Sequence, residues 1–190
     1  MKKLVLILGV AALLVGPMTV KAGGVYDGPA KGTSIIGARL GLSNIVGANV
    51  TYDYALAQVW KGTFTIGGQI GYMWNGHSNT VNWNGESYKH SWNNHYLSFR
   101  VRTTYRFNVV VPQWEVYGGV ALGGGMDIWS DNERIYSEGF DTRHGTGGFF
   151  SGAFILGTTY HFTDAIGLNL EFDFGDWASA WVNLGVQIKL

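Results

Sequence analysis

From residue 34 to the C-terminus, apolar residues alternate with small or polar residues in eight successive segments. Successive side chains of a β-strand point to opposite faces of a sheet, so this period of two predicts strands with one apolar and one polar face. The chain is therefore predicted to be all-β. The predicted strands are residues 35–43, 46–56, 63–75, 95–107, 114–123, 150–162, 166–175 and 180–190.

The two faces of these strands differ in bulk as well as in polarity. In the fourth segment, Leu97, Phe99 and Val101 alternate with Arg100 and Arg102. The interior of a closed barrel of about eight strands holds only modest side chains. The small and polar faces fit that interior, so the bulky apolar faces are predicted to point outward, into lipid. The alternative is a soluble β-sandwich, lipocalin-like barrel or jelly roll, in which the apolar faces point inward.

Segment and connector lengths favour an eight-stranded antiparallel transmembrane β-barrel, an up-and-down meander. Each segment is close to the roughly 9–11 residues that a tilted membrane strand needs. An even strand number places both chain ends on one side, and the two longest connectors, residues 76–94 and 124–149, both fall on the other side. Because such barrels have short periplasmic turns and long external loops, we expect external loops at 76–94 and 124–149 and periplasmic termini.

The first 22 residues have the form of a cleaved signal peptide. Lys2 and Lys3 precede an apolar stretch, Leu4–Val15, which is shorter than the roughly 20 residues of a membrane helix. Cleavage is expected near Ala22, and an uncleaved N-terminal anchor is the alternative. The predicted organisation is a signal peptide at 1–22, a short periplasmic segment at 23–33 and an outer-membrane barrel at 34–190 of a bacterial cell.

Composition excludes several classes of site. The chain has no cysteine, which excludes disulfides, thiolate metal sites, cysteine nucleophiles and an acylated cysteine anchor. The formal net charge is zero, so no basic face for nucleic acid is predicted. The histidines and carboxylates of the two long connectors match no zinc or calcium spacing. We therefore expect no cofactor, no metal site and no nucleic-acid partner.

Charged residues on the inward faces are predicted to pair with one another. Five of them are basic and four are acidic. A buried charge is tolerated only when it is paired and hydrogen-bonded, so this near balance predicts a polar and ion-pair network that plugs the lumen. The alternative is a narrow channel for small solutes or ions. The predicted lumen network is Arg39, Asp53, Gln69, Arg100, Arg102, Arg106, Glu115, His161, Glu171, Asp173 and Lys189.

The C-terminal sequence NLGVQIKL resembles the assembly signal of small outer-membrane barrels. Asn183, Gly185, Ile188 and Leu190 match its polar, glycine and apolar positions, although the family usually ends in Phe or Tyr and this chain ends in Leu. By architecture, residues 34–190 resemble the family that includes OmpX and the membrane domain of OmpA. The resemblance implies recognition by the barrel-insertion machinery and contact with outer-membrane lipid and lipopolysaccharide.

Some small barrels of this kind modify lipid A with a His-x-Ser motif and a downstream Glu. The nearest match is His161-Phe162-Thr163 with Glu171, where threonine replaces serine and the predicted position is periplasmic, away from lipid A. Of the three candidate functions, a non-enzymatic barrel, a narrow channel and a lipid A-modifying enzyme, the enzyme is therefore the weakest.

The connector 76–94 has the composition of a recognition surface. It contains Trp83, Tyr88 and Trp92 among many Asn and Ser residues, a mixture typical of binding loops. An extended hairpin without a specific ligand is the alternative. The favoured function is a non-enzymatic barrel that serves envelope structure or surface interaction through its two long connectors, with an extracellular ligand that the sequence does not identify.

Overall fold

The structure is a computed structural model that describes residues 25–42, 46–83, 86–135, 139–175 and 180–190. The predicted signal peptide lies outside these residues and stays a prediction. No helix in the described part of the chain is long and apolar enough to span a membrane. The described strands are β1 (Val25–Tyr26), β2 (Ser34–Leu42), β3 (Val46–Val59), β4 (Gly62–Trp83), β5 (Glu86–Val109), β6 (Trp114–Ile135), β7 (Gly139–His161), β8 (Ile166–Phe174) and β9 (Val182–Lys189).

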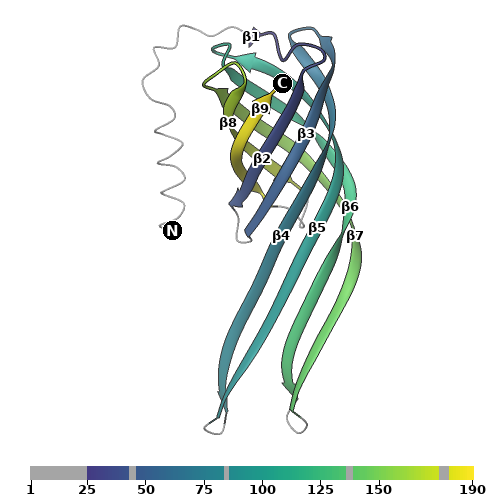
Figure 1. The fold of residues 1–190 in the computed structure, drawn as a ribbon, viewed down its shortest axis with the longest axis vertical. Coiled ribbons are helices and arrows are strands. Elements are labelled where there is room, and N and C mark those ends of the chain that lie inside the picture. The colour runs from purple at the N-terminus through teal and green to yellow at the C-terminus, as the bar shows by residue number, and fades with distance from the viewer. Residues whose placement is uncertain (1–24, 43–45, 84–85, 136–138, 176–179) are drawn as a thin grey trace.

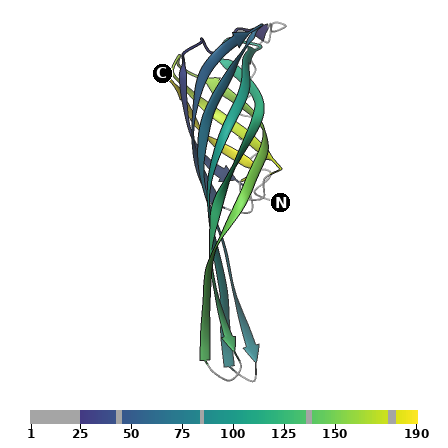
Figure 2. The same cartoon turned by 90° about the vertical axis from the view of Figure 1, so that its right-hand side faces the viewer.

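Strands β2 to β9 form one closed antiparallel sheet in which every strand pairs with its neighbours in sequence. The ring closes where β2 pairs with β9, from Ile35↔Lys189 to Gly41↔Asn183. Two perpendicular views show the resulting barrel, whose strands cross it at a tilt (Figure 1, Figure 2). The predicted all-β, eight-stranded, up-and-down antiparallel barrel is confirmed.

Side chains alternate across the barrel wall, with polar residues inside. In β3, Asn49, Thr51 and Asp53 are buried, whereas Val50 and Tyr52 between them are exposed. Among the described residues, the buried set contains far more polar and charged residues than apolar ones. This orientation is the reverse of that in a soluble β-sandwich or lipocalin-like barrel, where the interior is apolar.

The two connectors predicted to be long loops consist largely of strands, so that part of the prediction is wrong. β4 pairs with β5 up to Trp83↔Glu86, and β6 pairs with β7 up to Ile135↔Gly139. β5 also pairs with β6 as far as Ser91↔Asn132. We call the four-stranded extension that results the projecting sheet (residues 75–83, 86–94, 124–135 and 139–149; Figure 1).

The reason for this error is physical. A strand in a membrane needs an apolar face toward lipid, but a strand that extends into water does not. The apolar alternation therefore fades beyond Trp74, and the Asn, Ser and Gly residues that follow are frequent in turns and loops as well. The strands nevertheless stay paired beyond the barrel, because the β4–β5 and β6–β7 pairings run on in an unbroken register from the barrel into the projecting sheet.

We call the barrel end at which β2 begins and β9 ends the terminal end, and the opposite end, from which the projecting sheet extends, the hairpin end. Residues 27–33 pack against the terminal end. β1 pairs with β5 through Val25↔Val109. Pro29 is buried, and its carbonyl oxygen accepts a hydrogen bond of 2.6 Å from Thr63 Oγ1. A Cβ on Gly28 would collide with the backbone of Arg106. The N-terminal segment is thus part of the packed barrel.

Candidate functional site in the lumen and the projecting sheet

A cluster of guanidinium and carboxylate groups occupies the centre of the lumen. Arg102 of β5 forms a bidentate pair with Glu171 of β8, with Nη2–Oε2 at 2.8 Å and Nη1–Oε1 at 3.2 Å. Arg102 Nε lies 3.1 Å from Asp53 Oδ1 of β3, and Arg39 Nη2 of β2 lies 3.1 Å from Glu171 Oε2. None of these three pairs joins neighbouring strands of the ring. The pairs therefore bridge the lumen, and the bidentate geometry fixes both partners.

A second cluster lies nearer the terminal end and shares Asp53 with the first. Arg106 places Nη2 2.6 Å from Asp53 Oδ2 and Nη1 2.7 Å from Glu115 Oε1. The other oxygen of Glu115 lies 2.9 Å from Lys189 Nζ and 3.7 Å from His161 Nε2. Because Asp53 contacts both Arg102 and Arg106, the two clusters form one continuous chain of alternating charge.

Neutral side chains complete this chain, and sequence reasoning missed them. Tyr117 Oη donates a 2.7 Å hydrogen bond to Glu171 Oε2 and accepts one of 2.8 Å from Asn169 Nδ2. The guanidinium carbon of Arg106 lies 4.2 Å from the Tyr117 ring centroid, a cation–π contact. Asn169 Oδ1 also accepts a hydrogen bond from Arg39 Nε. Tyr117 and Asn169 both occupy inward-facing positions in the period-two pattern of their strands. That pattern was the one sequence feature that could have predicted them as lumen residues.

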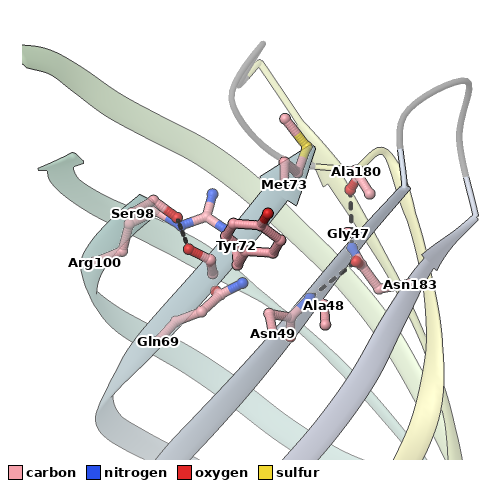
Figure 3. A pocket seen from close by; sticks show the side chains of 11 residues that line it. Gly47, Ala48, Asn49, Gln69, Tyr72, Met73, Ser98, Arg100, Ala180 and Asn183 are labelled. Carbon is pink, nitrogen blue, oxygen red and sulfur yellow. Dashed lines mark hydrogen bonds between the residues drawn. The ribbon is translucent and has the colours of Figure 1, made fainter. Parts of the chain in front are cut away.

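At the hairpin end, a small cavity with mixed polar and apolar lining lies in the lumen (Figure 3). Asn49 Nδ2 donates a 2.9 Å hydrogen bond to Asn183 Oδ1 at one side, while Arg100 and Gln69 line the other. Arg100 Nη2 is held 3.0 Å from Asp173 Oδ2. The cavity has a volume of about 10 Å³, and a single water needs roughly 10–15 Å³. It therefore has room for about one water molecule.

The structure places all of the predicted lumen residues on the inner side of the wall. Ten of the eleven are buried, and the Lys189 side chain, 18% exposed, lies at the rim of the terminal end. The ten buried residues are Arg39, Asp53, Gln69, Arg100, Arg102, Arg106, Glu115, His161, Glu171 and Asp173.

The projecting sheet carries the residues predicted to bind an external partner. Trp92 lies beside His77 of the neighbouring strand, with ring centroids 6.3 Å apart. The backbones of Trp83 and Tyr88 lie in the same hairpin. The side chains of Trp83 and Tyr88 lie outside the described residues, so the structure places only Trp92 of the three aromatic side chains.

Comparison with known families identifies the class of protein. The family model for the outer membrane protein beta-barrel domain matches residues 8–186, nearly the whole chain. This chain belongs to that family. The barrel is therefore a bacterial outer-membrane protein, and its exposed apolar wall contacts membrane lipid. The resemblance to small outer-membrane barrels that was inferred from the sequence is confirmed.

Two solved structures similar to this outer-membrane barrel are of Ail, the attachment invasion locus protein of Yersinia pestis. The first is 15% identical, covers 84% of this chain and 96% of Ail, and has a TM-score of 0.44. The second, Ail in complex with the heparin analogue sucrose octasulfate, is 14% identical, covers 83% and 92%, and has a TM-score of 0.42. No curated protein sequence matches this chain.

The residues of the predicted assembly signal lie at the closing seam of the barrel. Asn183 is buried, and its amide donates a 2.9 Å hydrogen bond to the carbonyl of Ala180. A Cβ on Gly185 would collide with the Ala38 backbone, so the close approach of β9 to β2 requires glycine here. Ile188 and Leu190 face outward. Recognition by the insertion machinery stays a prediction.

The residues of the lipid A-modifying motif have separate partners in this barrel. His161 Nε2 faces Glu115, whereas Glu171 is held by Arg102 and Arg39. Thr163 Oγ1 accepts a 2.9 Å hydrogen bond from the backbone of Ile166 and thereby belongs to the turn between β7 and β8. A nucleophile needs a base within hydrogen-bond reach. Neither His161 nor Thr163 has the other as its hydrogen-bonding or ion-pair partner.

Proposed function

We propose that this outer-membrane barrel is a non-enzymatic surface protein, in which a plugged lumen holds the projecting sheet outside the cell for interaction with an extended segment of another protein. Both barrel termini lie in the periplasm in this proposal. The lumen network provides rigidity, and the projecting sheet provides recognition. Binding sites commonly occur on exposed segments that a rigid scaffold positions.

The observation that carries this proposal is that both edges of the projecting sheet are open over the described residues. The pairing of β4 with β3 ends at Trp74, and that of β7 with β8 begins only at Phe154. Among the described residues, 75–83 and 139–149 therefore pair with a strand on one side only. Unpaired edge amides and carbonyls are a template for adding a strand from a partner.

The plugged lumen is supported by the ion pairs that bridge the barrel. Arg102–Glu171, Arg106–Asp53 and Lys189–Glu115 each join strands that are not neighbours in the ring. The small cavity at the hairpin end holds about one water molecule. An ion would have to break several buried charge pairs to pass, so we expect no steady conductance. Steady single-channel steps in planar bilayers would contradict the plug and favour the narrow channel.

The orientation can be tested directly because the chain contains no cysteine. Asn79→Cys places a thiol in the projecting sheet, and Lys61→Cys places a matched thiol in the β3–β4 turn at the terminal end. A membrane-impermeant maleimide added to intact cells is expected to label Asn79→Cys and to spare Lys61→Cys until the cells are lysed. The opposite labelling pattern would reverse the orientation.

The binding role is tested by removing the projecting strands and leaving the barrel. Asn-Gly replaces residues 77–92 in one variant, residues 128–146 in a second and both segments in a third. Each turn then joins residues that already face each other. The purified proteins are applied to an array of synthetic peptides of random sequence. We expect the intact chain to retain a subset of peptides and the variant lacking both hairpins to retain none. Equal retention by both proteins contradicts the proposal.

A further inference from the structure

An open groove of about 600 Å³ crosses the outer wall of the barrel over strands β2 to β6. Ligand pockets commonly have volumes of about 300–1,000 Å³. The side chains that face outward around the groove are apolar or aromatic, among them Tyr52, Ile70, Phe99 and Val101. The groove lies on the wall that contacts lipid, on the side opposite to the lumen network.

The floor of the groove is made by a glycine that the fold does not require. Gly68 pairs with Tyr52 on one side and with Val101 on the other. A Cβ at Gly68 would meet only the carbonyl oxygen of Arg100, at 3.8 Å, and its φ lies outside the left-handed region. A Cβ at position 68 would therefore meet only ordinary van der Waals contact. The hollow between Tyr52 and Val101 exists because position 68 carries no side chain.

The neighbouring glycine shows the contrast. A Cβ on Gly67, which faces the lumen, would collide with the carbonyl oxygen of Tyr52 and crowd Asp53. Packing therefore explains Gly67. It does not explain Gly68, where the wall of a membrane barrel would ordinarily present an apolar side chain.

We propose that this groove binds one acyl chain of a membrane phospholipid, held as a specific lipid rather than as part of the exchanging lipid shell. The groove is continuous with the apolar wall that already contacts lipid, so hydrocarbon is the chemistry available to fill it. The one polar group among its outward side chains, the hydroxyl of Tyr52, lies 3.0 Å from Ser34 Oγ. A chain in the groove contacts protein on several sides, and dispersion contacts add with their number.

The test compares Gly68→Phe with a matched substitution elsewhere on the wall. Gly118 also faces outward, and a Cβ there would meet only the carbonyl oxygen of Ile155, at 3.7 Å. It does not line the groove. Gly68→Phe fills the groove, whereas Gly118→Phe adds the same ring outside it. Folding of both variants is checked by resistance to trypsin in vesicles.

The probe is a phosphatidylethanolamine with a diazirine in the middle of one acyl chain, present as a tracer in vesicles of phosphatidylethanolamine and phosphatidylglycerol. In the wild type, we expect cross-links to concentrate on Ile70, Phe99 and Val101. In Gly68→Phe, cross-linking at these positions should fall by about tenfold, because losing contact with two methylene groups already corresponds to that factor. Gly118→Phe should cross-link like the wild type.

Two outcomes would overturn the proposal. One is a cross-link pattern spread evenly over the wall, with Phe154 and Leu156 of β7 labelled as strongly as Phe99. The other is an equal yield at the groove in the two phenylalanine variants. Native mass spectrometry that finds a dimer of the wild type but a monomer of Gly68→Phe would instead assign the groove to a second copy of the chain. If Gly68→Phe does not fold, the wild-type cross-link map alone decides.

Discussion

Strands β4 to β7 pass through two environments, and the two halves of the same strands are built differently. In the barrel half, inward residues such as Thr65 and Thr104 are buried and hydrogen-bonded to each other, and every strand has a neighbour on both sides. In the projecting half, His77 and Asn79 hydrogen-bond at the surface, and the described part of the sheet pairs on one side only along its two outer strands. Backbone groups must be satisfied internally in lipid, but water can satisfy them outside. Closure of the sheet is therefore needed only within the membrane.

The largest effect in a test of the difference between barrel and projecting sheet is expected in the lumen. Glu171→Gln removes the carboxylate that Arg102 and Arg39 share, and we expect it to lower the free energy of unfolding by about 3–5 kcal/mol, because it leaves buried charge without compensation. Asp27→Asn is the control, since Asp27 pairs with Lys61 at an exposed site; it should cost about 0–1 kcal/mol. Urea unfolding of the refolded proteins in vesicles measures both.

Equal effects of the two substitutions would show that the lumen network contributes no more to stability than a surface pair does. That result would also remove the main support for a rigid, plugged barrel.

An intermediate effect is expected at the two adjacent glycines of β4. Gly67→Ala forces a methyl group against the backbone of Tyr52, and overpacking of this kind costs about 1–3 kcal/mol. Gly68→Ala meets only ordinary van der Waals contact and should change stability by about 0.5 kcal/mol or less. The same urea titration compares them. A larger loss for Gly68→Ala would mean that the fold needs glycine there, which would weaken the argument for a lipid groove.

The smallest effect is expected in the projecting sheet. Asn79→Ala removes a 2.8 Å hydrogen bond to His77 at the surface, and it should alter the free energy of unfolding by about 0.5 kcal/mol or less. A loss as large as that of Gly67→Ala would show that the projecting sheet unfolds together with the barrel. The two regions would then form one cooperative unit.

The barrel could be predicted from the sequence because inside and outside alternate strictly within the membrane. Arg100 and Arg102 follow the same period as Phe99 and Val101, so assigning one face assigns the other. The projecting sheet could not be predicted in this way. In residues 76–94 no regular apolar period remains to distinguish a strand from a loop, and in residues 124–149 the period continues only through the outward Met126 and Ile128 before it fades.

The sequence also could not predict which lumen side chains contact one another. Tyr117 bonds to Glu171, 54 residues away, and to Asn169, 52 residues away. Period-two patterning assigns each of these residues to the interior but says nothing about which of them meet. Their pairing depends on the curvature and register of the whole ring, which become defined only when all its strands are in place.

The pairing of β2 with β9 determines when the barrel can close during folding. β2 is made early in synthesis and finds its second neighbour only in the last strand of the ring, through pairs such as Ile36↔Ile188. A chain that stopped short of β9 would not be a slightly smaller barrel, since both β2 and β8 would expose bare edges to hydrocarbon, where no water replaces the missing partner. Closure of the barrel wall therefore depends on β9, and a chain truncated before this strand could not form a complete membrane-spanning sheet.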